Sequence, residues 1–228
     1  MWKFFDQISC INLYSRDDRL EECQKVFKRL NIPCRVKRFH KHPNDGKKGC
    51  YESHLSVIRD AYVKGCENVL IFEDDVIESP YFDESLIEKA IEFMNNNNEW
   101  DIFYLGHQPD VFFSSSYAVS DYIMKTSSTL THAYVMSRKF MKKMLNREYD
   151  DTAIDKVYLA NENSYALYPM QFYQNESDSD ITASAPIRGL RYSEFYAYHI
   201  NYPILYFITL LISFIILIIV FIFLNKFS

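Results

Sequence analysis

The sequence lacks the cysteine patterns of a zinc-binding or disulfide-stabilised domain. Its five cysteines are an odd number, and no two of them form a C-x-x-C pair. Structural zinc sites and disulfide frameworks require paired cysteines at regular spacings, so neither is predicted. We expect each cysteine to be a small core residue in a reducing compartment.

The sequence also lacks the basic excess that nucleic-acid binding requires. The formal net charge is -5 at pH 7, and the isoelectric point is about 5.7. We therefore expect no nucleic-acid partner. One basic run, residues 35–48, departs from this overall sign. It fits either a solvated loop and strand edge, or a contact with an anionic substrate or lipid surface.

No signal peptide is predicted, because residues 1–13 contain neither a long apolar run nor a small-residue cleavage site. Long apolar runs are rare until residues 204–224, which carry no charge. As a helix this run would be about 31 Å long, against a hydrocarbon core of about 30 Å. It is therefore predicted to be a single transmembrane helix.

Flanking residues predict how that helix would sit in the membrane. Tyrosines crowd residues 196–203, as in an interfacial aromatic segment, and a short tail follows at 225–228. Arg188 and Arg191 lie on the domain side, and positive charge favours the cytosolic side of a membrane. We expect a tail-anchored protein whose domain faces the cytosol, with the sequon at Asn175 unglycosylated.

Alternating strand and helix patterns indicate one α/β domain over residues 1–195. Such alternation predicts a sandwich with a largely parallel sheet, and no internal repeat is present. Residues 161–191 are rich in Ser, Asn and Asp and are predicted to be loop with short strands. Strands are predicted at residues 7–13, 35–39, 68–72, 101–106 and 132–137. Helices are predicted at about residues 17–30, from the residue after Gly49 as far as Gly65, from residue 79 or residue 83 as far as residue 93, and at residues 138–145.

Three consecutive carboxylates, Glu73, Asp74 and Asp75, follow the apolar strand at residues 68–72. Like charges this close raise each other's pKa unless a cation or a positive partner offsets them. In open α/β sheets, ligands bind at the carboxyl ends of the strands. Hard oxygen ligands suit Mg²⁺ or Mn²⁺ shared with substrate phosphates. We predict that all three bind such a metal with the diphosphate of a nucleotide sugar; a solvated acidic turn is the alternative.

Four sequence blocks between Ile8 and Ile181 carry a resemblance to a known family: INLYSRDDR, GCYESHLSVIRDAYVKGCENVLIFEDDV, THAYVMSRKFMKKML and YALYPMQFYQNESDSDI. In this order they resemble the signature of glycosyltransferase family 25, which includes lipooligosaccharide and collagen galactosyltransferases. The ordered set is more specific than any single block. The matching positions are Asn12, Leu13, Arg16, Asp18, Arg19, Gly49, Cys50, Ser53, His54, Glu73, Asp74, Asp75, Tyr168, Pro169, Gln174, Ser179 and Asp180.

The resemblance implies a Rossmann-like, GT-A-type fold and an inverting transferase. The donor would be a UDP-hexose, of galactose or glucose, and the acceptor a hydroxyl of a glycan, lipid or protein. Mn²⁺ or Mg²⁺ would be bound by Glu73, Asp74 and Asp75. The residues expected to contact the donor are Asn12, Arg16, Arg19, Ser53, His54, Asp74, Gln174 and Asp180.

An inverting transfer needs one carboxylate as general base on the acceptor hydroxyl. The family places this aspartate in a P-x-D segment. Here Ala153 stands where proline is expected, and Asp155 stands at the matching place. Asp155 is the predicted base, with Asp150 and Asp151 as alternatives.

Two other functions fit parts of the sequence. A Mg²⁺-dependent phosphotransferase also places aspartates after a strand, but the expected downstream lysine and aspartate pair is not evident. A catalytically degenerate, membrane-anchored scaffold of the same fold is favoured by the missing proline and opposed by the intact carboxylates.

Overall fold

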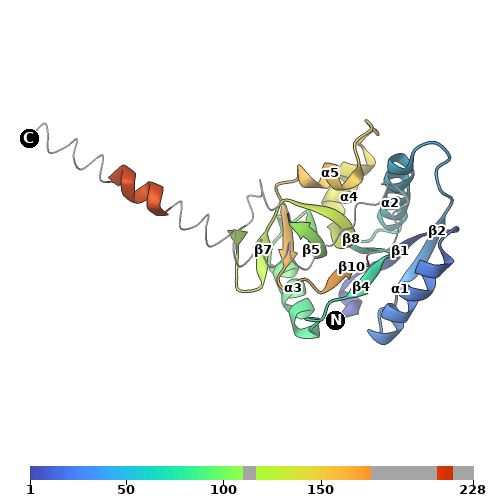
Figure 1. The fold of residues 1–228 in the computed structure, drawn as a ribbon, viewed down its shortest axis with the longest axis horizontal. Coiled ribbons are helices and arrows are strands. Elements are labelled where there is room, and N and C mark those ends of the chain that lie inside the picture. Colours follow the sequence, from blue (N-terminus) through green and yellow to red (C-terminus); the bar gives the residue numbers. More distant parts are fainter. Residues whose placement is uncertain (110–116, 176–209, 218–228) are drawn as a thin grey trace, which may run out of the picture.

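The computed structural model describes residues 1–109, 117–175 and 210–217 (Figure 1). Asp180, the arginines that flank the predicted span, and segments 196–203 and 225–228 lie outside the described residues.

An eight-stranded sheet forms the centre of the domain, in the order β2-β1-β3-β8-β5-β9-β7-β6 (Figure 1). Strand β1 is parallel to β2 and β3, and β5 is parallel to β9. Strand β8 runs antiparallel to both β3 and β5. The predicted α/β class with a largely parallel sheet is thus confirmed, although the sheet is mixed. Its strands are β1 (Gln7–Leu13), β2 (Arg35–Phe39), β3 (Asn68–Glu73), β5 (Ile102–Pro109), β6 (Tyr117–Ala118), β7 (Ile123–Lys125), β8 (Ser128–Ser137) and β9 (Ser164–Leu167).

Helices cover both faces of the sheet and produce two apolar cores. The pleat of β3 illustrates this division, because successive side chains of a strand point to opposite faces. Leu70 and Phe72 belong to the core beside α1 and α3, whereas Val69 and Ile71 belong to the core beside α2, α4 and α5. The helices are α1 (Asp17–Arg29), α2 (Gly46–Val63), α3 (Glu84–Asn96), α4 (Arg138–Leu145) and α5 (Ile154–Leu159), preceded by the short 3₁₀ turn η1 (Trp2–Phe4).

Two caps fix where helices begin. Asp45 accepts a hydrogen bond from the Lys48 N–H at 3.0 Å, so α2 begins before Gly49, earlier than the sequence predicts. Asp83, one of the two predicted starts, caps α3 by accepting from the Ser85 N–H at 2.8 Å. Such caps satisfy backbone donors that a first helical turn leaves unpaired.

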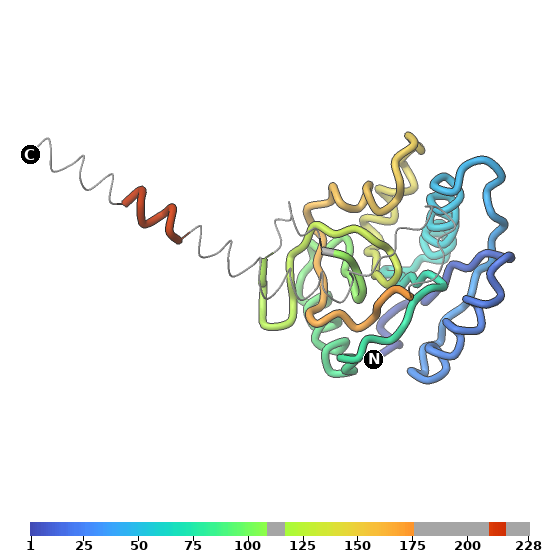
Figure 2. The backbone as a smooth tube through the Cα atoms, viewed as in Figure 1, coloured from blue at the N-terminus to red at the C-terminus, as the bar shows by residue number. Residues whose placement is uncertain are grey.

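A second, two-stranded sheet pairs β4 (Val76–Glu78) with β10 (Phe172–Gln174). Figure 2 shows the late orange segment returning beside the strand that follows β3. The Asn175 N–H donates to the Asp75 carbonyl at 2.7 Å, which extends this pairing. This pairing holds Gln174 and Asn175 next to Asp75.

The predicted membrane span is described only in part. Residues 210–217 are helical and exposed, and the remainder of 204–224 lies outside the described residues. Among the helices that the structure describes, none combines the length and apolarity needed to cross a bilayer.

Candidate active site

The carboxylates lie where the connectivity of the sheet changes direction. The connection after β1 leads to β2 on one side, and the connection after β2 leads to β3 on the other side of β1. Crevices at such switch points, outside the carboxyl ends of the strands, are the usual ligand sites of open α/β sheets. Asn12 at the end of β1 and Glu73 at the end of β3 border this crevice.

Glu73 continues the alternation of β3 and turns toward α2. Its Oε1 lies 3.3 Å from Nε2 of His54, and the Thr131 hydroxyl donates a hydrogen bond to the same oxygen. Burial raises the pKa of the Glu73 carboxyl, but the interactions with His54 and Thr131 outweigh burial and hold that pKa below its usual value. Glu73 is therefore an ionised, partly buried carboxylate with partners of its own.

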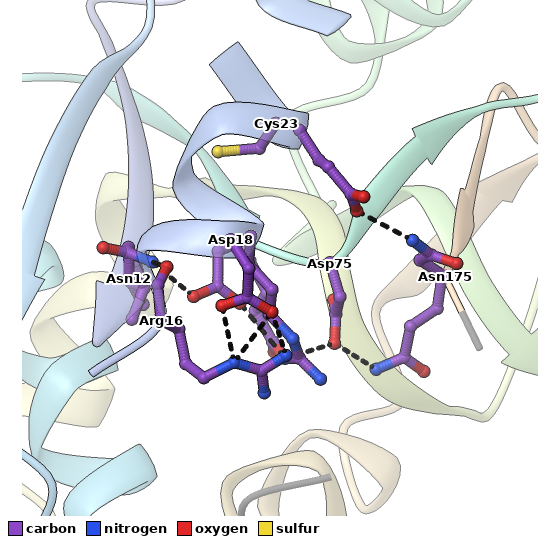
Figure 3. Close-up of polar contacts among 12 residues, drawn as sticks. Asn12, Arg16, Asp18, Cys23, Asp75 and Asn175 are labelled. Atoms are coloured by element: carbon purple, nitrogen blue, oxygen red, sulfur yellow. Dashed lines mark hydrogen bonds and ion pairs between the residues drawn. The ribbon is translucent and has the colours of Figure 1, made fainter. Parts of the chain in front are cut away.

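Asp74 and Asp75 share one positive partner, Arg19. Its Nη1 lies 3.2 Å from Oδ1 of Asp74 and 3.2 Å from Oδ2 of Asp75. The Asn12 amide donates to Oδ2 of Asp74 at 2.7 Å, and the Gln174 amide donates to Oδ2 of Asp75 at 2.9 Å. Figure 3 shows the Asp75 carboxylate between the start of α1 and the segment that ends at Asn175. An arginine therefore offsets part of the charge of this cluster.

Asp75 nevertheless keeps an unused acceptor. Its Oδ1 is buried and has no hydrogen-bond partner among the described residues, and the same is true of Oε1 of Gln174. Burial, followed by the charge of Glu73, raises the pKa of Asp75 to about 7. Burial also raises the pKa of Asp74. Buried acceptors and incompletely neutralised carboxylates are the surroundings that a divalent cation would stabilise.

The predicted three-carboxylate metal site is not formed as one set. Among the described residues, no group of three or more His, Cys, Asp or Glu side chains could hold a metal ion. Glu73 is the last residue of β3 and contacts His54, whereas Asp74 and Asp75 lie in the turn that follows the strand and contact Arg19. The residues present therefore fit a cation at Asp75 rather than at all three carboxylates.

The remaining predicted donor contacts have different surroundings. Arg16 pairs with Asp18 at 2.8 Å, and this hydrogen bond lowers the pKa of Asp18 to about 2. Ser53 donates to the Gly49 carbonyl, one turn earlier in α2, at 2.7 Å. His54 is fully buried, with Nδ1 2.8 Å from the Tyr134 hydroxyl. Of the predicted set, the structure gathers Asn12, Arg19, Asp74 and Gln174 around Asp75.

Asp155 lies in the first turn of α5 and is partly exposed. Burial raises the pKa of the Tyr104 hydroxyl, and the charge of Asp155 raises that pKa further. Burial also raises the pKa of Cys50, and the charges of Glu73, Asp155 and Asp75 add to that increase. Helix α5, which carries Asp155, packs against β8 and α2, the elements that contribute Thr131 and His54 to the surroundings of Glu73.

The two alternative bases have partners elsewhere. Asp150 pairs with Arg147 at 2.7 Å, and Asp151 pairs with Lys47 at 3.0 Å. Asp155 accepts only a backbone hydrogen bond from Lys156, at 2.8 Å, among the contacts of the described residues. Of these three aspartates, Asp155 is therefore the one whose carboxylate has no ion-pair partner among the described residues.

Three residues of the site were not predicted from the sequence. Thr131 and Tyr134 lie in the THAYVMS block, where only the resemblance marked them, and Tyr158 lies in a helix that was not predicted. Arg38 is a fourth addition: its Nε donates to the Asn12 side chain at 2.9 Å and so holds the amide that contacts Asp74. The only sequence feature that pointed to Arg38 was its place in the basic run at residues 35–48.

The fold and the site define a doubly wound α/β protein with a carboxylate-containing ligand site at the carboxyl ends of its parallel strands. The chain belongs to glycosyltransferase family 25: the family model, described as glycosyltransferase family 25 (LPS biosynthesis protein), matches residues 35–158. This match confirms the resemblance seen in the sequence blocks.

Curated relatives are similar to between 28% and 72% of this chain. Procollagen galactosyltransferase 1 of Danio rerio is 23% identical over 174 residues, covering 63% of this chain and 29% of the relative. A glycosyltransferase 25 family member of Aedes aegypti is 28% identical over 171 residues, covering 72% of this chain and 25% of the relative. A probable inactive glycosyltransferase 25 family member 3 of Rattus norvegicus is 33% identical over 63 residues, covering 28% of this chain and 11% of that protein. The chain spans less than a third of the length of these relatives.

Solved structures give weaker likenesses. Protein A197 from STIV has a TM-score of 0.48 at 9% identity, covering 78% of this chain and 98% of that chain. A glycosyltransferase involved in the glycosylation of the major capsid of PBCV-1 has a TM-score of 0.42 at 9% identity, covering 83% of this chain and 99% of that chain. These values are too low to support an assignment of function.

Proposed function

We propose that the domain is a metal-dependent, inverting glycosyltransferase that moves a hexose from a UDP-sugar to a hydroxyl acceptor. The observation that carries the proposal is the carboxyl-edge site, in which Asp74 and Asp75 are buried beside Arg19, together with the packing of α5, which carries Asp155, against α2 and β8. Family membership supports the reaction class. The names of the relatives as procollagen galactosyltransferases favour galactose as the hexose.

Asp75 would hold Mn²⁺ or Mg²⁺ through its unused Oδ1, with Oε1 of Gln174 as a further oxygen ligand. The bound cation would neutralise the diphosphate of the donor as it leaves. Both oxygens of Asp74 already accept hydrogen bonds, from Asn12 and Arg19, so Asp74 would mainly hold Arg19 in place. A guanidinium group so placed suits phosphate oxygens.

Asp155 would take the proton of the acceptor hydroxyl as that oxygen bonds to the anomeric carbon. The bond from that carbon to the diphosphate breaks in the same displacement, so the configuration inverts and no covalent sugar-enzyme intermediate forms. A carboxylate without an ion-pair partner among the described residues is suited to accept this proton.

A degenerate scaffold is the second candidate, because one relative is named probable inactive and Ala153 replaces the expected proline. The backbone opposes this interpretation. Ala153 has φ -60°, within the range that a proline ring would impose, and it directly precedes α5. The substitution therefore preserves the entry of the chain into the helix that carries Asp155.

A donor screen tests the proposal. The purified full chain is incubated with a panel of UDP-sugars in Mn²⁺, in Mg²⁺ or in EDTA, and nucleotide release is measured. We expect release from UDP-galactose or UDP-glucose that requires the metal. UDP binding without release from any sugar, in a folded sample, would favour the scaffold instead.

We also propose that residues 204–224 anchor the protein in a membrane with the domain on the cytosolic side. The described apolar side chains within 210–217 support this, since they are 46–66% exposed. In sealed microsomes, the full chain should resist carbonate extraction while its domain is digested by added protease. Ile212→Lys with Ile216→Lys should release the chain, because each lysine costs about 2.5–3.5 kcal/mol in a bilayer. Protection of the domain, or retention of the double variant, would contradict the proposal.

A further inference from the structure

A chain of side chains, buried from His54 onward, connects the end of β3 to α5, the helix that carries Asp155. It starts at Glu73 and passes through His54, whose Nε2 lies 3.3 Å from Oε1 of the carboxylate. Nδ1 of His54 lies 2.8 Å from the Tyr134 hydroxyl, which lies 3.2 Å from the Tyr158 hydroxyl. His54 and Tyr134 are fully or almost fully buried, as is Tyr158. Four elements, β3, α2, β8 and α5, are joined in this way.

The protons of this chain have one arrangement that leaves no hydroxyl unused. The Tyr158 O–H donates to the Tyr134 oxygen, and the Tyr134 O–H donates to Nδ1 of a neutral His54. The remaining ring proton then lies on Nε2, facing the Glu73 carboxylate. If His54 carried both protons, Nδ1–H would occupy the Tyr134 oxygen, and the buried Tyr158 O–H would lose its acceptor, which is costly. The tyrosines thus specify both the histidine tautomer and the direction of each hydrogen bond.

Helix α5 is held by a small number of side chains, with Val157 packed at the edge of the core and the Leu159 carbonyl accepting a hydrogen bond from Ser127. It contains six residues, which is too short to be stable in isolation, and only Ile154 and Tyr158 are buried. The Tyr158 ring packs at 5.4 Å from Tyr134 and at 5.9 Å from Phe140. Asp155 and Tyr158 are three positions apart and so lie on one side of the helix. Because Tyr158 is one of the two buried residues of α5, we expect a change in its packing to shift the helical turn that carries Asp155.

We propose that Tyr134 is a positioning residue that orients Asp155 through Tyr158 while it orients Glu73 through His54. The inference deepens the proposed function and rests on it, since Asp155 must be the base for its position to matter. A displacement of about 1 Å in a reacting group costs up to about 10²-fold in rate. The hydroxyl of Tyr134, rather than its ring, is the part that performs this role.

Tyr134→Phe in the full chain is the direct test, because it keeps the ring and removes both hydrogen bonds. We expect kcat for sugar transfer to fall about tenfold. The KM for the UDP-sugar should not change, since α5 contributes no residue to the donor cluster, which consists of Asn12, Arg19, Asp74, Asp75 and Gln174. Tyr158→Phe removes only the bond to α5 and should give a similar fall. The double variant should lose no more than either single variant, because both interrupt one chain.

Tyr104→Phe is the matched control. The Tyr104 hydroxyl is also buried, its ring lies 6.3 Å from that of Tyr134, and it has no hydrogen-bond partner among the described residues. Removing it deletes the same group beside the chain but outside it, so kcat should stay within about twofold of the native value. An equal fall in Tyr104→Phe would overturn the inference.

Hydrogen exchange separates this inference from the proposed function. Amides of α5 should exchange faster in Tyr134→Phe and Tyr158→Phe than in the native chain or in Tyr104→Phe, whether or not the protein transfers sugar. A native chain without transferase activity would contradict the proposed function, while the exchange result would still test the chain. An active native enzyme whose kcat and α5 exchange are unchanged in both variants would overturn the inference.

Discussion

Asp155→Asn should lower kcat for transfer by about 10²–10⁴-fold, the usual contribution of a general base. Asparagine keeps the size of the side chain and can still accept the hydrogen bond that Lys156 donates to Asp155, so α5 should remain in place. The KM for the UDP-sugar should not change, because the donor cluster is formed by other elements. Steady-state kinetics with donor and acceptor varied separately measure both effects.

Asp150→Asn and Asp151→Asn are the controls for this result. Their carboxylates are exposed and pair with Arg147 and Lys47, so each change should alter kcat by no more than about twofold, as expected for surface ion pairs. If either control loses transfer while Asp155→Asn retains it, the assignment of the base is wrong. Circular dichroism of all three variants excludes unfolding as the cause.

Asp75→Asn should abolish metal-dependent turnover of the donor. The change removes the charge that Oδ1 would offer to a cation, and metal ions supply several kcal/mol of transition-state stabilisation, which corresponds to about 10²–10³-fold in rate. The apparent affinity for Mn²⁺, followed by nucleotide release or by calorimetry, should fall in parallel. The native chain in EDTA should show the same loss.

Two further carboxylates sharpen this prediction. Glu78→Gln changes a residue in the adjacent strand β4 that pairs with Arg29, and it should leave the metal dependence unchanged. Asp74→Asn should mainly lower stability, because Asp74 accepts from both Asn12 and Arg19. Full activity of Asp75→Asn, or of the native chain in EDTA, would contradict a metal at Asp75.

The main elements could be predicted from the sequence because their signals are local. The apolar run at residues 68–72 became β3, and the block at 132–137 became the second half of β8. Helix α5 gave no such signal, since six residues with two buried positions do not establish a period of 3.6. The short strands β4, β6 and β7 depend on their partners for pairing and were missed for the same reason.

The site shows the same limit at the level of single residues. The sequence marked Glu73, Asp74 and Asp75 as one group, and only the structure shows that β3 ends at Glu73 and that the following turn directs the other two carboxylates to Arg19. Gln174 could be selected from the resemblance, but its contact with Asp75 depends on the pairing of β10 with β4. Arg19 was expected at the phosphates of the donor, and its bridge between two carboxylates is a tertiary feature that no local pattern encodes.

The pairing of β10 with β4 has a consequence for how the protein is made. Gln174 follows Asp75 by 99 positions, so a nascent chain that emerges from the ribosome completes the first three parallel strands long before the carboxylate receives its amide partner. Before Gln174 arrives, the Asp75 carboxylate either is buried with Arg19 as its side-chain partner or is exposed to solvent. Folding during synthesis therefore leaves the donor cluster unfinished until the end of the domain, and fragments that stop before residue 172 should fold poorly around it.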